Sequence, residues 1–356
     1  MKILIVDDSV VYRMAIKQAL EEIEDFSVVG ALSNGQLAVD WISQNREVDL
    51  MTLDMEMPQF DGLSTIKAVR KINKKIPIVV FSSNTTKGAE KTIDALSSGA
   101  NDFVTKEEAS TTKTIEGNLE MIRQSLVPKI KALVRKTPLA KDKIKPFLQT
   151  SIPTPSKPSS LESLMMIKPK IILMASSTGG PDALMSILRS LKKGKMNIPI
   201  LIVQHMPPIF TRRLAMSLDN ICEGYQIKEA QEGDELIPGV CYMAPGDYHM
   251  TLGKDKKIRL NQNEKVCFVR PAANCLFESV ANNFRGQIAS FTLTGMGEDG
   301  ALGVKQLHKV GAYNFYQDEE SCAVFGMPGS VKNLGTAQEI KLPKISEIIN
   351  LINSRV

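Results

Sequence analysis

IILMASSTGGPDAL, residues 171–184, has the form of a strand, a tight turn and the beginning of a helix. The apolar run at 171–174 predicts a buried strand. Gly179 and Gly180 allow a tight turn, and Pro181 suits the first turn of a helix because its missing N–H has no partner there. The same alternation of apolar runs and amphipathic stretches continues on both sides, which indicates parallel α/β structure.

The second half of the chain continues this pattern. Further strands are predicted at 200–203, 288–293 and 312–316, and helices at 182–191, 210–220 and 301–310. Short runs broken by Gly and Pro at 225–248 predict hairpins within or beside the sheet. We therefore expect residues 167–356 to form a doubly wound α/β domain with an added β-hairpin.

The first 125 residues predict a separate α/β domain. Five apolar runs (3–6, 28–31, 50–54, 78–81 and 102–105) alternate with four helical stretches (10–22, 36–45, 63–72 and 88–98). This is typical of a flavodoxin-like fold with a five-stranded parallel sheet. Between the domains, residues 126–166 predict a basic Pro-rich linker, because residues 128–160 contain six prolines and eight Lys or Arg against one acid.

Composition narrows the class of protein. A length of 356 residues suggests two domains, and 43% hydrophobic with 23% charged residues exclude wholesale disorder. No apolar run approaches the ~18 residues that span a bilayer. The N-terminal apolar run ends at Asp7 and Asp8, too early for a signal peptide. We expect a cytoplasmic protein without membrane insertion.

Charge and cysteine content exclude two further classes. The net charge of +5 accompanies no nucleic-acid-binding motif, so no nucleic-acid partner is expected. The five cysteines form no C-x-x-C pair, which favours reduced thiols over a zinc site or a disulfide framework.

Acidic residues follow two strands of the first domain. Asp7 and Asp8 end the first strand and Asp54 ends the third. The carboxyl ends of parallel strands meet at one edge of a sheet, so the three carboxylates should converge and favour Mg²⁺. Ser82 and Lys106 end the fourth and fifth strands, where they can contact a phosphoryl group on Asp54. One such Asp would be explained by turn capping, but three together favour a site.

Four motifs of this domain resemble the response-regulator receiver family. They are VDDS (6–9), LDMEMPQFDG (53–62), FSSNTT (81–86) and GANDFVTK (99–106). The resemblance implies that Asp54 is the phospho-acceptor and that Asp7, Asp8 and Asp54 bind Mg²⁺. It also implies that Ser82 and Lys106 sense the phosphoryl group.

The strand–turn–helix at 171–184 has two possible uses. Backbone amides at the helix N-terminus favour an anion, and Ser177 at the same turn can be a nucleophile beside an oxyanion pocket. From this segment alone, anion binding or a purely structural role is favoured.

A nucleophilic serine needs a base, and the chain has three histidines. His205 follows the strand at 200–203 and should share an edge with Ser177. His308 lies in a predicted helix and is expected to be structural, whereas His249 remains open. Asp299 follows a further strand, so a serine, a histidine and an aspartate are predicted at one edge of the sheet.

Two other motifs compete with a Ser–His–Asp site. GMGEDG (295–300) matches the dinucleotide fingerprint G-x-G-x-x-G, although Glu298 and Asp299 would repel a pyrophosphate. The nucleophile elbow G-x-S-x-G of α/β-hydrolases is matched only in part, because Ala175 replaces the first glycine. A nucleotide-binding output domain and an adaptor that docks through its basic linker therefore remain as alternative functions.

Six segments of the second domain resemble the chemotaxis protein-glutamate methylesterases, the CheB family. They are ASSTGGP (175–181), QHMP (204–207), APGDYHM (244–250), RPAANCLF (270–277), LTGMGEDGA (293–301) and VFGMP (324–328). The resemblance implies Ser177 as nucleophile, His205 as base, Asp299 as orienting acid and the Met296 backbone N–H as oxyanion donor. Asn274 stands where this family often has Asp.

The resemblance also implies partners and regulation. The substrates would be glutamate γ-methyl esters on chemoreceptors, with glutamine deamidation as a second activity. A chemotaxis histidine kinase would donate the phosphoryl group, and the ester chemistry would use no cofactor. Phosphorylation would shift a packed interface between the domains that covers the active site.

Overall fold

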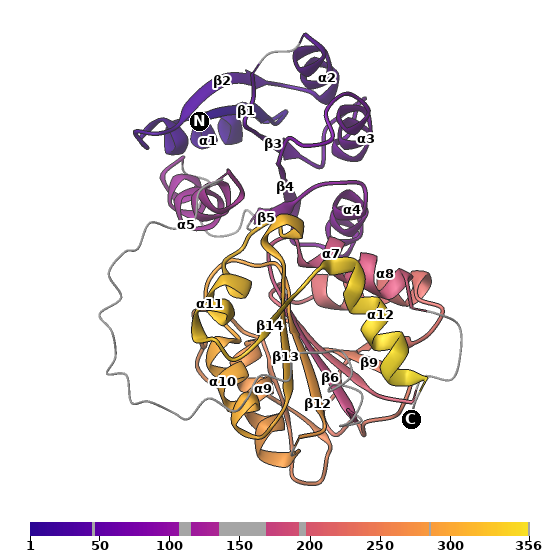
Figure 1. Ribbon diagram of the computed structural model, residues 1–356. Coiled ribbons are helices and arrows are strands. Elements are labelled where there is room, and N and C mark those ends of the chain that lie inside the picture. The colour runs from indigo at the N-terminus through magenta and orange to yellow at the C-terminus, as the bar shows by residue number, and fades with distance from the viewer. Residues whose placement is uncertain (45–46, 107–114, 135–168, 192–196, 285, 355–356) are drawn as a thin grey trace.

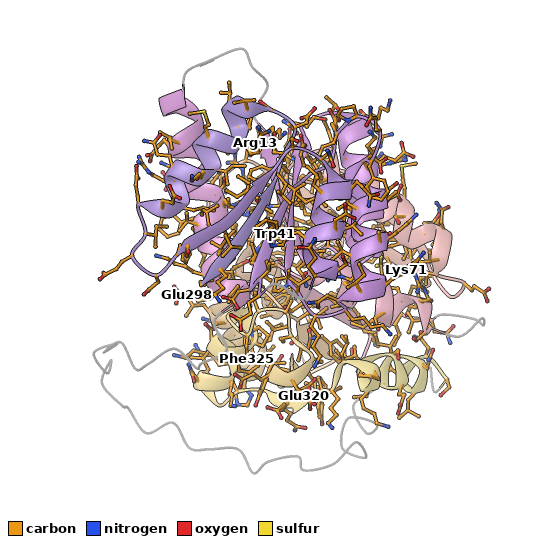
Figure 2. All side chains as sticks on the ribbon, turned by 90° about the horizontal axis from the view of Figure 1, so that it is seen from above. Arg13, Trp41, Lys71, Glu298, Glu320 and Phe325 are labelled. Atoms are coloured by element: carbon orange, nitrogen blue, oxygen red, sulfur yellow. The ribbon has the colours of Figure 1, made fainter. Side chains whose placement is uncertain are left out.

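In the computed structural model the chain forms two modules, each built around one parallel sheet (Figure 1). The structure describes residues 1–44, 47–106, 115–134, 169–191, 197–284 and 286–354. Seen from above, the first module lies in front of the second, whose α11 and α12 project beyond it (Figure 2). Within the described residues, no helix is both long and apolar enough to span a bilayer.

The first module has a five-stranded parallel sheet in the order β2-β1-β3-β4-β5, which confirms the predicted fold. Its strands are β1 (Lys2–Val6), β2 (Ser27–Leu32), β3 (Leu50–Asp54), β4 (Ile78–Ser83) and β5 (Asp102–Lys106). Its helices are α1 (Val10–Glu21), α2 (Gly35–Ser43), α3 (Gly62–Ile72), α4 (Thr86–Ser97) and α5 (Ile115–Val134).

Local sequence sets where the helices of this module begin. Each of the first four starts after a polar residue whose side chain accepts a backbone N–H, as expected of N-caps: Ser9, Asn34, Asp61 and Thr85. The strands between them read as continuous apolar runs because helices cover both faces of the sheet.

The domain boundary at residue 125 was wrong, because α5 continues to Val134. Pro128 suggested a linker, yet it lies within the helix. Leu126 and Ile130 are fully buried in the core beneath α1 and β1, so packing outweighs the helix-breaking tendency of the proline. The rest of the predicted linker lies outside the described residues.

The second module has a seven-stranded parallel sheet in the order β14-β13-β12-β6-β7-β9-β8. Its strands are β6 (Ile171–Ser176), β7 (Ile200–Gln204), β8 (Gln226–Glu229), β9 (Val240–Met243), β12 (Ile288–Thr292), β13 (Tyr313–Gln317) and β14 (Gln338–Ile340). Its helices are α7 (Gly180–Arg189), α8 (Phe210–Ile221), α9 (Ala273–Asn283), α10 (Ala301–Lys309), η1 (Glu319–Ser321), α11 (Met327–Leu334) and α12 (Leu342–Asn353).

The hairpins expected at 225–248 were wrong. This segment holds β8 and β9, which pair in parallel at the edge of the main sheet. The added hairpin lies just downstream, where β10 (His249–Leu252) and β11 (Ile258–Asn261) pair antiparallel. Short runs broken by Gly and Pro suit an edge strand as well as a hairpin. Here the neighbouring strand β7, far away in sequence, decides the pairing direction.

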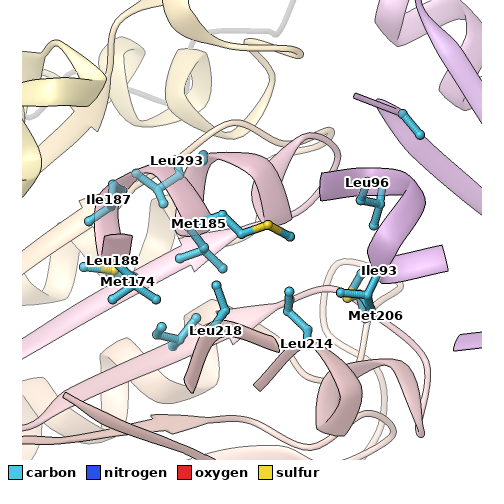
Figure 3. Close-up of a cluster of buried hydrophobic side chains, with 14 of the residues drawn as sticks. Ile93, Leu96, Met174, Met185, Ile187, Leu188, Met206, Leu214, Leu218 and Leu293 are labelled. Atoms are coloured by element: carbon cyan, nitrogen blue, oxygen red, sulfur yellow. The ribbon is translucent and has the colours of Figure 1, made fainter. Parts of the chain in front are cut away.

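The two modules share an apolar interface. Helix α4 of the first module packs against α7 and α8 of the second (Figure 1). Ile93 and Leu96 of α4 lie beside Met206 and Leu214 in one cluster of buried side chains (Figure 3). The Phe103 ring stacks on that of Phe210 with 4.6 Å between centroids. One apolar core therefore runs from one sheet to the other, and burial of its surface holds the modules together.

Candidate active site

Three adjacent strands bring the predicted catalytic residues to one edge of the second sheet. Ser177 follows β6, His205 follows β7, and Asp299 lies in the loop after β12. These strands are parallel neighbours in the order β12-β6-β7, so their carboxyl ends meet. The three residues therefore follow neighbouring strand ends.

His205 and Asp299 form a hydrogen-bonded pair. The Nε2 atom of His205 lies 2.8 Å from an oxygen of Asp299, whose side chain is 2% exposed. The carboxylate also accepts the backbone N–H groups of Ala273, at 2.5 Å, and Asn274, at 3.0 Å, at the start of α9. Because Asp299 accepts at Nε2, the Nδ1 atom of His205 is left to accept a proton.

Ser177 is held through its backbone. Its N–H donates to the Thr294 carbonyl at 3.0 Å, and its carbonyl accepts from the buried side-chain amide of Gln204 at 3.0 Å. Gly295 packs so closely that a Cβ there would lie 2.8 Å from the Cβ of Ser177. Within the described residues, the hydroxyl of Ser177 makes no hydrogen bond. The backbone thus fixes the serine while its Oγ remains available.

A narrow cleft lies at the domain interface and contains both Ser177 and His205. Its volume is about 20 Å³, room for about one water molecule. The first module supplies part of its wall through Asp102, Phe103 and Lys129. In this conformation the cleft is too small for a glutamyl ester.

A polar network crosses the interface beside the serine. The Thr178 hydroxyl donates to Asp102 at 2.6 Å, and Lys129 of α5 binds the other oxygen of the same carboxylate at 2.7 Å. Thr178 and Asp102 are 4% and 6% exposed. The hydrogen bond between Thr178 and Asp102 is buried and has a charged acceptor, so it is stronger than a hydrogen bond between neutral groups. It joins the first module to the residue next to Ser177.

The acidic cluster of the first module is also assembled. Carboxylate oxygens of Asp7, Asp8 and Asp54 all lie within 4.8 Å of one another. The Lys106 ammonium is 2.8 Å from Asp54 and 3.2 Å from Asp7. Three hard oxygen donors at this spacing fit a divalent cation such as Mg²⁺, so the residues present suit the metal.

Burial governs the ionisation of this cluster. It raises the pKa of Asp7 to about 6 despite the opposing charge of Lys106, and it raises the pKa of Asp54 as well. Burial alone would lower the pKa of Lys106, but the carboxylates of Asp54 and Asp7 raise it overall. Lys106 is therefore a charged partner for anionic groups at this edge.

Ser82 lies at the predicted strand end but faces elsewhere. Its hydroxyl, 1% exposed, donates to the Gly88 carbonyl of α4 at 3.1 Å. Lys106 therefore contacts the acidic cluster, whereas the Ser82 hydroxyl is hydrogen-bonded to the beginning of α4.

The contacts of His249 and of the GMGEDG segment show what each does in the fold. His249 is 1% exposed; its Nδ1 accepts the Ala272 N–H and its Nε2 contacts the Glu264 carbonyl at 3.0 Å. It is therefore structural. In the GMGEDG segment, the Asp299 carboxylate binds His205 and the first N–H groups of α9, so a negative charge lies in the turn where a fingerprint would receive a pyrophosphate.

Several residues of the site had no sequence signal of their own. Gln204 and Thr178 lie within sequence motifs that do not single them out, yet Gln204 fixes the serine turn and Thr178 joins it to the first module. Asn274 caps α10, because its side-chain oxygen accepts the N–H groups of Gly300 and Gly303 at 3.1 and 2.8 Å. The only signal for these residues in the sequence was a polar side chain directly beside the motif residues.

Fold and site together define a class of protein: a receiver-type module with a clustered acidic site, packed on a parallel α/β domain that presents a serine, a histidine and an aspartate at one edge. Comparisons agree. The response regulator receiver domain family matches residues 3–115, and the CheB methylesterase family matches residues 172–350.

Relatives match over nearly the whole length. A protein-glutamate methylesterase/protein-glutamine glutaminase of Trichodesmium erythraeum is 40% identical over 353 residues, 98% of this chain and 97% of the relative. One of a Nocardioides species is 35% identical over 346 residues, 95% of this chain and 91% of the relative. The solved CheB methylesterase catalytic domain of Thermotoga maritima is 40% identical with a TM-score of 0.49, covering 51% of this chain and 98% of that one.

The chain belongs to the CheB methylesterase family. It is an enzyme with a receiver domain, as the resemblance implied, and the nucleotide-binding alternative finds no support among these relatives.

Proposed function

We propose that this protein is a phosphorylation-activated serine hydrolase that removes methyl groups from glutamate γ-methyl esters of chemoreceptors in the cytoplasm. The names of the relatives carry the reaction class. The observation that carries the residue roles is the His205–Asp299 hydrogen bond beside a cleft that contains Ser177.

The proposed reaction begins with attack of the Ser177 Oγ on the ester carbonyl carbon. His205 accepts the serine proton at Nδ1, while Asp299 stabilises the imidazolium through Nε2. Collapse of the tetrahedral intermediate breaks the bond to the methoxy oxygen, which takes the proton from His205 and leaves as methanol. Water then attacks the acyl-enzyme and gives a proton to His205. Collapse of this second intermediate breaks the bond to the Ser177 Oγ, which takes the proton back from His205, and glutamate is released.

Backbone amides are proposed to stabilise the oxyanion. Gly295 packs against Ser177, which supports the next amide in the same loop, that of Met296, as a donor. Within the described residues this N–H donates to no acceptor, as expected of an oxyanion-hole donor. Preorganised amides of this kind act where negative charge develops in the transition state.

Glutamine deamidation is a second activity that the same groups support. The acyl-enzyme is identical, and ammonia leaves in place of methanol. The names of both relatives include protein-glutamine glutaminase. The proposed ester and amide chemistry needs only side chains, backbone amides and water.

Strand β5 connects the two sites of the protein. Its last residue, Lys106, contacts Asp54, and its first residue, Asp102, holds Thr178 beside the nucleophile. We infer that a phosphoryl group on Asp54, donated by a histidine kinase, draws Lys106 and Ser82 toward itself. Because Ser82 bonds to the start of α4, the change would loosen the α4 and β5 contacts that close the cleft.

Asp7, Asp8 and Asp54 would hold Mg²⁺ for this phosphorylation. The metal would neutralise charge as the phosphoryl group is transferred. The residues of the chain position the acceptor: Lys106 offsets the charge of Asp54, and the Glu56 backbone N–H donates to it at 3.2 Å.

A serine-directed fluorophosphonate tests the proposed nucleophile. The full-length protein, activated with acetyl phosphate and Mg²⁺, should be labelled covalently, and peptide mapping should place the label on Ser177. The label should be absent from Ser177→Ala. A labelled residue elsewhere, in protein that releases methanol from a methylated receptor, would refute the assignment.

A further inference from the structure

Two residues near the active site form a turn that their side chains do not favour. Val266 and Val269 exchange backbone hydrogen bonds of 3.2 and 3.1 Å, which closes a two-residue hairpin turn. Its central residues, Cys267 and Phe268, have φ of +51° and +65°. Turns with positive φ at both central positions favour Asn-Gly, because a Cβ is strained in this region. A phenylalanine therefore occupies a position where glycine would be more stable.

No burial in the folded structure offsets the backbone strain at Phe268. Phe268 is 95% exposed, more than any other exposed large hydrophobic side chain of the described residues. Its ring is therefore almost entirely in water, where an apolar group gains nothing. Neither backbone preference nor burial accounts for the residue. An exposed aromatic side chain in a strained turn is the form expected of a contact with another molecule.

The turn is fixed beside the catalytic aspartate. The Cys267 sulfur accepts from the Asn274 side chain at 3.6 Å, and the Asn274 N–H donates to Asp299 at 3.0 Å. Arg270 closes the base of the hairpin through its ion pair with Asp247 at 2.6 Å. These contacts fix the position of the turn that carries the Phe268 ring.

Similar strain occurs in the neighbouring loops. Of the six non-glycine residues with positive φ in the described chain, Ile209 and Asp247 join Cys267 and Phe268 in loops around the site. Gly246 packs on the segment that follows His205, and the Asp247 N–H donates to Arg270. Residues with a strained backbone persist where the surrounding structure holds them in place, and they cluster at active sites and ligand-binding sites.

These loops also expose apolar side chains. Ile209, Tyr248 and Met296 are 39%, 39% and 41% exposed. Together with Phe268 they are exposed apolar side chains of the loops that carry or flank the site, and we call these four residues the rim: Ile209, Tyr248, Phe268 and Met296. Phe268 does not line the cleft that contains Ser177 and His205. A substrate group that contacts Phe268 therefore lies outside this cleft.

We propose that Phe268 docks the protein helix that carries the glutamate methyl ester, by contacting an apolar side chain on the same helical face. This rests on the proposed function. Residues three, four or seven positions apart share a face of a helix, so an ester in the cleft places apolar neighbours over the rim. An exposed aromatic in a fixed position is the usual form of an interface anchor.

The test compares a protein substrate with a small one. Full-length protein is activated with acetyl phosphate and Mg²⁺, and methanol release is measured from a methylated chemoreceptor fragment and from N-acetylglutamate γ-methyl ester. For Phe268→Gly we expect kcat/KM on the receptor to fall about tenfold, mainly through KM. Turnover of the small ester should be unchanged, and Tm should be unchanged or higher because glycine relieves the positive φ.

Two controls sharpen the result. Phe268→Trp should keep most of the receptor activity, because it retains an aromatic ring. Ile237→Ala removes another exposed apolar side chain, 56% exposed, in the loop before β9, and should change neither substrate. An equal loss on both substrates, a lowered Tm for Phe268→Gly, or wild-type kinetics on the receptor would each overturn the docking role. A wild-type protein that releases no methanol would instead overturn the proposed function, and the docking role with it.

Discussion

The Thr178 hydroxyl, one residue from the nucleophile, donates a 2.6 Å hydrogen bond to Asp102 of the receiver module. Both side chains are buried, and Asp102 is held in turn by Lys129. The regulatory module therefore contacts the catalytic turn directly. This contact makes interdomain control testable at single residues.

Loss of this contact should activate the unphosphorylated enzyme. A hydrogen bond to a charged group contributes about 1.5–3 kcal/mol, and about 1.4 kcal/mol shifts an equilibrium tenfold. We expect Asp102→Ala to raise basal methanol release by about tenfold or more, with the phosphorylated rate unchanged. Arg213→Gln is the matched control. It breaks an ion pair with Glu90, itself 53% exposed, at the same interface and should raise the rate less. A basal rate equal to wild type for Asp102→Ala would argue against control through this contact.

The two adjacent serines should behave differently. Ser177→Ala removes the proposed nucleophile and should lower turnover by a factor on the order of 10⁴ to 10⁶ at unchanged Tm. The hydroxyl of Ser176 only donates to Gln204 at 2.6 Å, so Ser176→Ala should keep measurable activity with a lowered Tm. Methanol assays and thermal melts on both variants decide which serine reacts, and the reverse pattern would exchange their roles.

Asp299→Asn should affect both catalysis and stability. The carboxylate accepts from His205, Ala273 and Asn274, and an amide has only one oxygen to accept with. We expect kcat to fall about 10⁴-fold, as when an orienting acid is lost, and the free energy of unfolding to fall by about 1–3 kcal/mol. An unchanged Tm would contradict its role in holding α9.

Asp54→Asn should abolish activation by a phosphodonor. The variant has no carboxylate to form the acyl phosphate, so acetyl phosphate with Mg²⁺ should leave its methanol release at the basal rate. The same protein without phosphodonor is the reference. If the donor still increased the rate of the variant, phosphorylation would occur elsewhere.

Mg²⁺ should stabilise the protein through the acidic cluster. Lys106 offsets only part of the charge of the three converging carboxylates, and a divalent cation offsets the rest. We expect saturating Mg²⁺, at about 100 times its Kd, to add about 2.7 kcal/mol to the free energy of unfolding of the receiver module. Asp8→Asn should lose most of this effect in a thermal melt. An equal Mg²⁺ response in both proteins would place the metal elsewhere.

Much of the architecture was readable from local pattern. The alternation of apolar runs and capped helices predicted both parallel sheets, and strand ends marked Asp54, Ser177, His205 and Asp299. Where the prediction was wrong, local and long-range signals disagreed. Pro128 suggested a linker, but buried side chains such as Ile130 keep it helical. Strands β8 and β9 resembled a hairpin, but β7 decides their direction.

Local periodicity was enough to predict the helices and strands and to place Asp54, Ser177, His205 and Asp299 at or after strand ends. Three features needed the three-dimensional structure: the His205 nitrogen that meets Asp299, the hydrogen bond between Thr178 and Asp102, and the exposure of Phe268. Each of these depends on atoms of segments far apart in the chain. Such contacts are set by side-chain packing and hydrogen-bond geometry, which short-range pattern does not encode.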